Sequence, residues 1–215
     1  MTDLGAEIIK VNGDYERSVE VSSEDAKAKE YYDANPGGDN IVLQLQSYGE
    51  IAYEIYDDLR DAPRIVAVPV SNGTTIAGIY KGFLSLYRRG KTSRMPTFIA
   101  GSSFKKNPIV QAILLNKEKC EDLKPEKIKE SKINEPLINW HSIDGDFALN
   151  AIRATNGWAA DATDKEMLSY SKLIRDKEGM SVMPAATAGL IALIEHHKKE
   201  SIGSDRFVVI LTGRN

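Results

Sequence analysis

Ile65-Val66-Ala67-Val68-Pro69-Val70 opens the stretch of sequence that decides the fold of this 215-residue chain. A continuous apolar run of this length is typical of a strand buried on both faces of a parallel sheet. The small polar loop Ser71-Asn72-Gly73-Thr74-Thr75 follows, and Ile76–Tyr87 then carries apolar residues at helical spacing. A strand, a short loop and a helix in this order form the repeating unit of α/β proteins.

Two other apolar runs, Thr97–Gly101 and Phe207–Leu211, predict further buried strands. A shorter run, Gly5–Val11, also predicts a strand, which the turn residues Asn12-Gly13-Asp14 would end. Because helical patterns alternate with these runs, we predict an α/β fold with a mainly parallel sheet and helices on both faces.

The other helices are predicted from their start and stop signals. Capping boxes match Ser47–Glu50 and Thr163–Glu166, so we expect each to open a helix. Asn107-Pro108 has the form of an N-cap followed by proline in the first turn. Gly179 is expected to end the helix that begins at Thr163, and Pro184 to begin the next one.

A loop punctuated by proline and glycine, Asp33–Gly38, separates the first helical pattern, Ser18–Tyr32, from the rest of the chain. We place a domain boundary there, between residues 1–34 and residues 35–215. The lysine- and glutamate-rich stretch Asn116–Asn139 has few large apolar residues, so we interpret it as an exposed excursion.

The composition excludes several function classes. A net charge of −3 gives no basic excess for nucleic acid, and one cysteine, Cys120, excludes a disulfide framework. Three histidines provide little for a metal site, and we predict none. No apolar run approaches the roughly 20 residues that span a bilayer, and the start of the chain lacks the features of a signal peptide. We therefore expect a soluble cytoplasmic protein with no membrane partner.

The loop after the first buried strand is the strongest candidate for chemistry. Ligands of parallel sheets bind beyond the carboxyl ends of the strands, and a helix N-terminus there offers free N–H groups to an anion such as phosphate. Ser71, Thr74 and Thr75 would add hydroxyl donors. The loop lacks the lysine of a nucleotide-binding P-loop and the pattern G-x-G-x-x-G. An ordinary strand-to-helix turn remains the alternative.

Weaker candidates lie elsewhere in the chain. The hydroxyl of Thr212, at the end of the last predicted strand, could reach a ring nitrogen of a ligand at the same edge, or could merely cap the strand. His141 is interpreted as structural or exposed, and His196-His197 as charge complements to a helix C-terminus.

Taken in order, the motifs resemble those of an enzyme family. Pro69–Gly78 with Lys81-Gly82-Phe83 resembles the phosphate-binding loop and helix of fold-type II pyridoxal-phosphate (PLP) enzymes, whose fold is tryptophan synthase β-like, and within them the threonine synthase group. The other stretches that agree in the same order are Leu4–Glu7, Tyr32–Pro36, Asn107–Ile109, Glu178-Gly179 with Pro184–Ala186, and Val209–Gly213.

The resemblance implies a PLP-phosphate site made of Ser71, Asn72, Gly73, Thr74 and Thr75. It also implies that Thr212 hydrogen-bonds the pyridine nitrogen, where a hydroxyl leaves the ring uncharged. Residues 1–34 would be a remnant of the family's small domain, and residues 35–215 the main part of its large, phosphate-binding domain. Relatives usually have glycine where this chain has Ser71, and the serine either adds a donor or weakens the site.

The family also uses a lysine that forms a Schiff base with PLP, in a segment resembling S-x-K-D-R. We expect this segment, and the loop that binds the substrate carboxylate, to lie before the point where the sequence begins, so that the fold is incomplete. Lys81 is predicted to face away from the site, and Lys172 lies in mid-helix. We therefore predict that the chain has no catalytic lysine and no covalent PLP attachment.

The predicted strand Gly5–Val11 would then lack its neighbours. We expect it to be disordered, to pair with another copy of the chain, or to pair with a separate chain that carries the missing half. The resemblance implies a threonine synthase-like lyase. Full-length relatives convert O-phosphohomoserine to threonine, and we expect this chain to be inactive alone. The alternatives are a related PLP enzyme, such as cysteate synthase or a Ser/Thr dehydratase, and a non-catalytic protein that binds PLP, phosphate or a partner.

Overall fold

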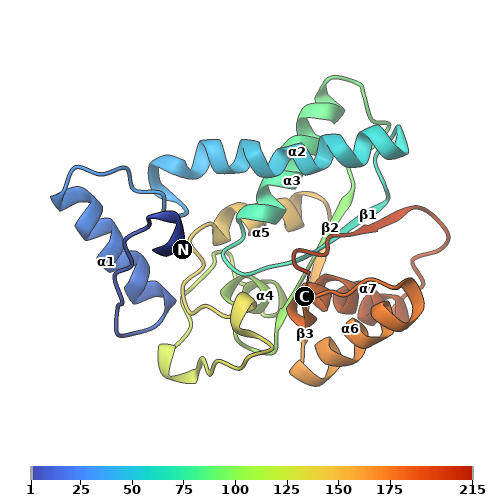
Figure 1. Cartoon of the computed structure of the whole chain (residues 1–215). Coiled ribbons are helices and arrows are strands. Elements are labelled where there is room, and N and C mark those ends of the chain that lie inside the picture. The colour runs from blue at the N-terminus through green and yellow to red at the C-terminus, as the bar shows by residue number, and fades with distance from the viewer. Residues whose placement is uncertain (1, 215) are drawn as a thin grey trace.

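The computed structural model describes residues 2–214 and has a four-stranded sheet at its centre (Figure 1). The strand order is β3-β2-β1-β4, and every neighbouring pair is parallel. The strands are β1 (Ile65–Pro69), β2 (Thr97–Ser103), β3 (Trp158–Ala162) and β4 (Phe207–Val209). The predicted α/β fold with a parallel sheet is therefore confirmed.

Strand β1 lies between β2 and β4, and all five of its residues are buried. Val66 is in register with Phe98 on one side and Val208 on the other. Because successive side chains point to opposite faces of a strand, both faces of β1 need an apolar cover. This is the arrangement that the continuous apolar run predicts.

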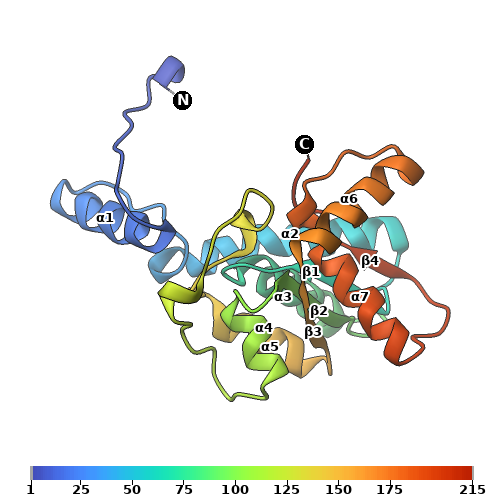
Figure 2. The same ribbon diagram turned by 90° about the horizontal axis from the view of Figure 1, so that it is seen from below.

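Helices cover both faces of the sheet (Figures 1 and 2). One face packs against α7 (Ala188–Lys199), beside which lies α6 (Asp164–Glu178). The other face packs against α3 (Thr74–Arg88), α4 (Pro108–Leu114) and α5 (Gly145–Ala154). The long helix α2 (Ile41–Leu59) packs on α3 as an outer layer, and α1 (Tyr15–Ala28) lies to one side of the molecule.

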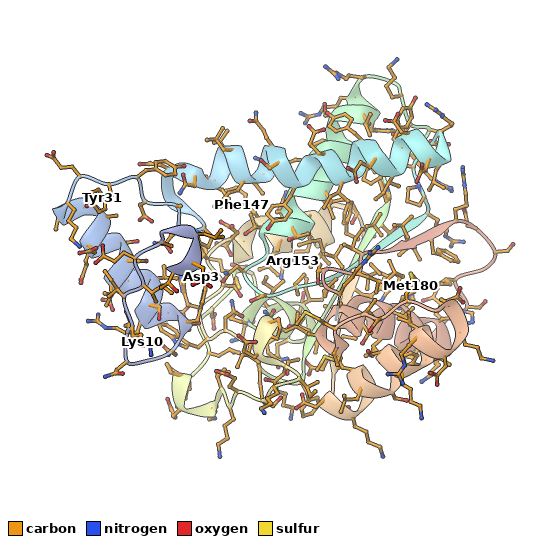
Figure 3. All side chains as sticks on the ribbon, in the orientation of Figure 1. Asp3, Lys10, Tyr31, Phe147, Arg153 and Met180 are labelled. Carbon is orange, nitrogen blue, oxygen red and sulfur yellow. The ribbon has the colours of Figure 1, made fainter. Side chains whose placement is uncertain are left out.

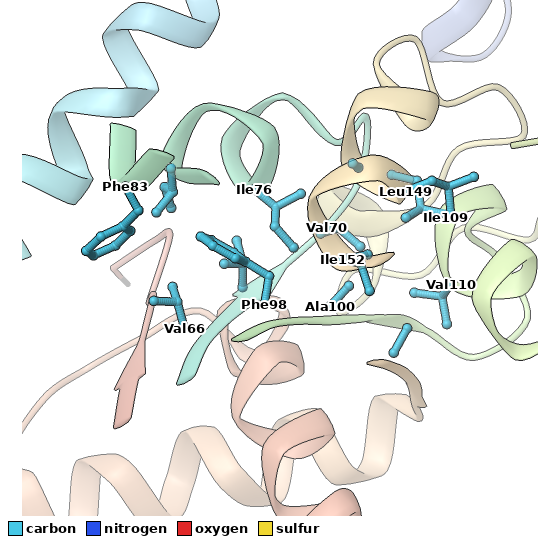
Figure 4. Close-up of a cluster of buried hydrophobic side chains, with 14 of the residues drawn as sticks. Val66, Val70, Ile76, Phe83, Phe98, Ala100, Ile109, Val110, Leu149 and Ile152 are labelled. Carbon is cyan, nitrogen blue, oxygen red and sulfur yellow. The ribbon is translucent and has the colours of Figure 1, made fainter. Parts of the chain in front are cut away.

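The main apolar core lies between the sheet and the α3 side (Figure 4). Phe98 on β2 is fully buried, and its ring makes edge-to-face contacts with Phe83 and Tyr80, at centroid distances of 6.4 and 5.9 Å. Val66 and Ile76 lie in the same cluster. This core fixes the direction in which α3 leaves β1, and so positions the loop between them.

The capping box predicted at Ser47 is wrong. Helix α2 begins six residues earlier, at Ile41, and the Ser47 hydroxyl donates to the carbonyl oxygen of Leu43 within the helix. The helix runs through this point because its face packs closely on α3. A Cβ atom added to Gly82 would lie only 2.4 Å from the carbonyl oxygen of Gly49, so the absence of a side chain at Gly82 permits the close approach.

Two predicted strands also differ from the structure. Gly5–Val11 forms no strand: its backbone pairs with no other segment of residues 2–214, and Figure 2 shows it extending away from the body of the chain. Phe207–Leu211 is shorter and less buried than predicted, because β4 ends at Val209 and lies half-exposed at the sheet edge.

Other local signals are confirmed. The Asn107 side chain caps α4 by accepting from the amides of Ile109 and Val110. Thr163 and Glu166 form the reciprocal capping box of α6, and Gly179 ends that helix in the left-handed conformation. The stretch between Asn116 and Asn139 is mostly irregular.

Sequence analysis missed β3 and α5. Strand β3 reads Trp-Ala-Ala-Asp-Ala, which has no β-branched residue, so its strand propensity is weak. It is a strand because it pairs with β2, where Gly101 faces Ala160. No helix of residues 2–214 is both long enough and apolar enough to cross a membrane.

The segment before the predicted domain boundary is attached to the body at one end of α1. The carboxylates of Asp14 and Glu16 accept hydrogen bonds from the indole and the backbone amide of Trp140. The labelled side chains of Asp3, Lys10 and Tyr31 lie on this side of the molecule (Figure 3). The division at residue 34 itself stays a prediction.

Candidate functional site

A cavity of about 500 Å³ lies at the carboxyl end of β1. All six residues predicted to bind the cofactor line it: Ser71, Asn72, Gly73, Thr74, Thr75 and Thr212. The remaining lining residues come from several helices, the end of β1 and the connecting segments, and they are Tyr15, Pro36, Gln44, Tyr48, Pro69, Val70, Ile76, Pro136, Leu137, Met183, Ala185, Ala186 and Gly213. The structure thus brings together two predicted segments that are far apart in the sequence.

The loop at the base of the cavity depends on Gly73. This residue is the N-cap of α3 and has a φ of 97°, a conformation that residues with a Cβ rarely adopt. An added Cβ atom would also lie 2.9 Å from Cβ of Ala148 and 3.0 Å from the carbonyl oxygen of Asp144. Both the backbone conformation and the packing therefore require glycine here.

The carbonyl groups of the loop are held by other segments. The oxygen of Ser71 accepts from Asn107 Nδ2 at 2.9 Å and from Ser142 Oγ at 3.1 Å. The oxygen of Asn72 accepts from the amide of Asp144 at 3.0 Å. The oxygen of Gly73 accepts from the amide of Ala77, the first bond of α3.

The amide groups of the loop are free by comparison. Within residues 2–214, the N–H groups of Gly73, Thr74, Thr75 and Ile76 have no hydrogen-bond partner. Unpaired N–H groups at a helix N-terminus carry partial positive charge, and helix α3 adds its dipole to them. The hydroxyls of Ser71 and Thr75 are likewise unengaged within this part of the chain. The loop has the chemistry of an anion site, most simply one for phosphate.

Another wall of the cavity is formed by the C-terminal segment. Thr212 is exposed and Gly213 accepts from the amide of Met183 at 3.1 Å. An antiparallel bridge between Val182 and Arg214 holds the same two segments together. Thr212 therefore lines the same cavity as the loop, as the sequence predicted, although its role toward a ligand remains a prediction.

Two asparagines support the loop from outside the predicted site. Asn139 donates from Nδ2 to the side-chain oxygen of Asn72 at 3.1 Å and accepts from Asn107 at 3.0 Å. On the other side, Asn72 donates to the hydroxyl of Tyr15 at 3.2 Å. Sequence reasoning identified Asn107 only as a helix cap, and no local signal marked Asn139 or Tyr15.

One carboxyl group, that of Asp144, lies against the loop. Its side chain is buried and accepts a hydrogen bond from the Thr74 hydroxyl. Burial raises the pKa of Asp144, because removal of water disfavours the charged form, and the Thr74 bond opposes this only in part. No local sequence pattern marked Asp144 as a residue that contacts the loop.

No lysine is among the described residues that line the cavity. Lys81 is exposed and is not among the residues that line the cavity, and its Nζ lies 5.7 Å from the ring centroid of Phe147, which Figure 3 labels. Lys172 is exposed on α6. Within residues 2–214, no cluster of three or more His, Cys, Asp or Glu side chains could hold a metal ion.

The histidines have structural contacts. His141 is exposed and its Nδ1 lies 2.8 Å from Asp122. The ring of His196 stacks on Trp158 with a centroid distance of 3.5 Å, at the end of the sheet away from the cavity. Neither ring is among the residues that line the cavity.

Curated relatives are threonine synthases. The chain is 29% identical over 212 residues to threonine synthase of Methanocaldococcus jannaschii and 28% identical over 212 residues to that of Methanosarcina acetivorans. Each alignment covers 97% of this chain and 50% of the relative. The chain therefore spans about half the length of the curated relatives that it matches.

Solved structures share the fold at lower identity. Maize serine racemase superposes with a TM-score of 0.76 at 17% identity, over 100% of this chain and 62% of that one. Threonine deaminase isoform 2 from Solanum lycopersicum superposes with a TM-score of 0.77 at 15% identity, over 100% of this chain and 57% of that one. These likenesses establish the fold, which is that of fold-type II PLP enzymes.

The sequence pattern described as "Pyridoxal-phosphate dependent enzyme" matches residues 1–213. This match covers the loop, the cavity and all four strands. The chain belongs to the pyridoxal-phosphate dependent enzyme family.

Proposed function

We propose that this chain supplies the phosphate-binding part of a threonine synthase-like PLP enzyme. The observation that carries the proposal is the row of unpaired amides at Gly73–Ile76, at the carboxyl end of the central strand, in a chain of this family. The threonine synthase relatives support this specificity over that of cysteate synthase or a dehydratase. The substrate class that follows is an amino acid bearing a phosphate ester, such as O-phosphohomoserine.

The residues present fit the cofactor. The amides from Gly73 to Ile76, with the hydroxyls of Ser71 and Thr75, would bind the 5′-phosphate, because donors and helix dipole together favour a dianion. Thr212, on another wall of the same cavity, would donate to or accept from the pyridine nitrogen. When bound, PLP supplies an electron sink for carbanions at the substrate α-carbon. The chain's part in this proposal is to bind and orient the cofactor.

We also propose that the amine that holds the cofactor covalently is not in this chain. The support is the absence of lysine among the described residues that line the cavity. The α-proton transfer that this amine performs would then also be missing, so the chain alone would be inactive. The chain would act with a separate polypeptide that carries the lysine, or with a second copy of itself.

The segment before α1 is the surface that we propose for such a partner. Leu4, Ile8 and Ile9 are exposed, by 90%, 52% and 59%, and their backbone has no strand partner within residues 2–214. An extended segment with apolar side chains and unpaired backbone groups favours pairing with another chain. Light scattering of the purified chain, with and without a co-expressed lysine-bearing partner, tests this. A chain that stays monomeric in the presence of every such partner, and that has full threonine synthase activity by itself, would contradict the proposed partner surface.

The experiment for the main proposal combines binding and covalent trapping. PLP is added to the purified chain, the mixture is reduced with borohydride, and the labelled peptides are mapped. We expect PLP to bind, pyridoxal without the phosphate not to bind, and no lysine near the cavity to be labelled. A single stoichiometrically labelled lysine would refute the proposal that the chain lacks the amine. Equal binding of PLP and pyridoxal would refute the phosphate site.

A non-catalytic protein that binds PLP is the second candidate, and it is favoured because none of the described residues that line the cavity is a lysine. The two functions differ in one measurement. Threonine formation from O-phosphohomoserine is assayed with the chain alone and with a lysine-bearing partner. Activity only in the mixture supports the enzyme, while PLP binding that no partner converts into activity supports the binding protein.

A further inference from the structure

Asp144 contacts three consecutive residues of the proposed phosphate loop. Its amide donates to the carbonyl oxygen of Asn72 at 3.0 Å, and its own carbonyl oxygen lies close beneath Gly73. Its carboxylate oxygen Oδ2 accepts from the Thr74 hydroxyl at 2.5 Å. Asp144 is 2% exposed and does not itself line the cavity, whereas Thr74 does. Thr74 is therefore the link between the buried carboxyl and a ligand.

The direction of this hydrogen bond matters because a threonine hydroxyl has only one proton to donate. While Asp144 is ionised, it can only accept, so the Thr74 proton points at the carboxylate and is not available to an anion. A protonated Asp144 can donate instead to Thr74 Oγ1. The Thr74 proton is then free to turn toward the cavity.

Among residues 2–214, no cation offsets the charge of Asp144. Burial is the leading cause that raises its pKa, and the Thr74 hydrogen bond counteracts it. The charged and titratable groups on neighbouring elements have other contacts. Lys81 of α3 lies over Phe147, Arg153 donates to the carbonyls of Lys117 and Glu118, and His141 pairs with Asp122. The Asp146 carboxylate accepts from the amide of Cys120, whose thiol packs near Gly145.

We propose that Asp144 takes up a proton from solvent when a phosphate group binds at residues 71–75, and that Thr74 thereby changes from a donor to Asp144 into a donor to the phosphate. The inference rests on the proposed function, since it takes the loop to be the phosphate site. Its physical basis is that a dianion beside an uncompensated buried carboxylate disfavours the charged carboxylate. No other group needs to gain or lose a proton.

A pH dependence follows from this coupling. Affinity for a dianion should be highest when Asp144 is already protonated and should fall as rising pH ionises it. A change of one unit in the pKa of Asp144 on binding corresponds to about a tenfold change in affinity. Sulfate is the suitable probe, because it remains a dianion across the range in which phosphate and PLP change their own charge.

The experiment measures sulfate binding by calorimetry between about pH 5 and pH 8, which lies above the ordinary carboxyl pKa of about 4. Measurements in buffers of different ionisation enthalpy give the number of protons taken up. For the wild type, we expect affinity to fall about tenfold over this range, with fractional proton uptake on binding. Asp144→Asn should bind at pH 8 as tightly as the wild type binds at pH 5, without proton uptake.

Two further variants separate this role from mere support of the loop. Asp146→Asn removes an exposed carboxylate in the first turn of α5, two residues after Asp144, and should behave as the wild type. Thr74→Val removes the hydroxyl at nearly constant shape and should weaken binding most at low pH. If Asp144 were only structural, Asp144→Asn would bind more weakly at every pH with the same slope, and this result would overturn the proposal.

The failures of the two proposals are distinguishable. A wild-type chain that binds neither sulfate nor PLP at any pH would refute the phosphate site itself. A chain that binds sulfate with no pH dependence and no proton uptake would keep the site and refute the role of Asp144. Circular dichroism checks that each variant folds, and if Asp144→Asn does not fold, the proton uptake of the wild type decides.

Discussion

Two apolar segments of this chain, Ile65–Val70 and Gly5–Val11, both predict strands, and only the first becomes one. Residues 65–69 form β1, with paired strands on both sides and helices on both faces. Gly5–Val11 is irregular and exposed, with no paired neighbour in the described chain. An apolar pattern therefore indicates a preference for a strand, and the strand forms only where other segments supply hydrogen bonds and apolar cover.

The loop after β1 and the segment before α1 also differ in how other parts of the chain support them. The loop that follows β1 is held through its carbonyls by Asn107, Ser142 and Asp144, which come from two other segments. The segment before α1 has no such support within residues 2–214. The loop is therefore held in a defined geometry by other segments, while association of the segment before α1 with another chain stays a proposal.

The largest expected difference between the regions is in stability. Phe98→Ala leaves a cavity in the core beside β1 and should lower the free energy of unfolding by about 3–5 kcal/mol. Ile8→Ala removes an exposed side chain and should change it by less than about 0.5 kcal/mol. Urea denaturation followed by circular dichroism measures both. Similar losses in the two variants would mean that the N-terminal segment is packed as tightly as the core.

Gly73→Ala should have the next largest effect, about 1–3 kcal/mol, because it adds a strained backbone conformation and close contacts. It should also abolish binding of sulfate and PLP. Gly90→Ala is a matched control, since Gly90 has a φ of 65° with open space around its missing Cβ. This control should lose about 1 kcal/mol and keep full binding. Equal binding by the two variants would contradict the account of the loop.

Asn107→Ala tests the support of the loop. It removes the cap of α4 and the bond to the Ser71 carbonyl, and should lower stability by about 1–2 kcal/mol and sulfate affinity several-fold. Thr163→Ala removes the cap of α6, away from the cavity, and should lower stability by about 1 kcal/mol with unchanged affinity. A parallel loss of affinity in both variants would show that general stability, not loop geometry, controls binding.

The smallest effect concerns stability against pH at Asp144. Burial raises the pKa of Asp144 in the folded state above its value in the unfolded state. The contribution of Asp144 to stability is therefore fully present at low pH and is lost as the pH rises through the folded-state pKa. Asp144→Asn should therefore unfold at a higher temperature than the wild type at neutral pH. The difference should shrink toward about pH 4, near the unfolded-state pKa. A difference independent of pH would contradict the raised pKa of Asp144.

Strong local signals predicted the centre of the fold and the site. The run before Ser71 predicted β1, and the turn chemistry of Gly73 and the spacing of α3 predicted the loop and helix. The Thr163–Glu166 capping box is confirmed because β3 ends directly before it and leaves Thr163 in an extended conformation, as an N-cap requires. The pattern at Ser47 has the same form but lies inside α2, where packing on α3 outweighs it.

The support of the site could not be predicted from local pattern. Asn139 and Asp144 reach Asn72 and Thr74 across about seventy residues of chain, and only the folded sheet and helices bring them there. Strand β3 was missed because its alanines carry no strand preference without β2 beside it. In each case the deciding interaction is tertiary.

We propose that loop 71–75 recognises the phosphate of the cofactor independently of any covalent bond. Pyridoxamine 5′-phosphate tests this directly, because it carries the phosphate and has no aldehyde to react with lysine. Its fluorescence, titrated against pyridoxamine without phosphate, should show binding of the phosphate form only, lost in Gly73→Ala and kept in Gly90→Ala. Equal binding of both compounds, or binding that survives Gly73→Ala, would contradict the claim.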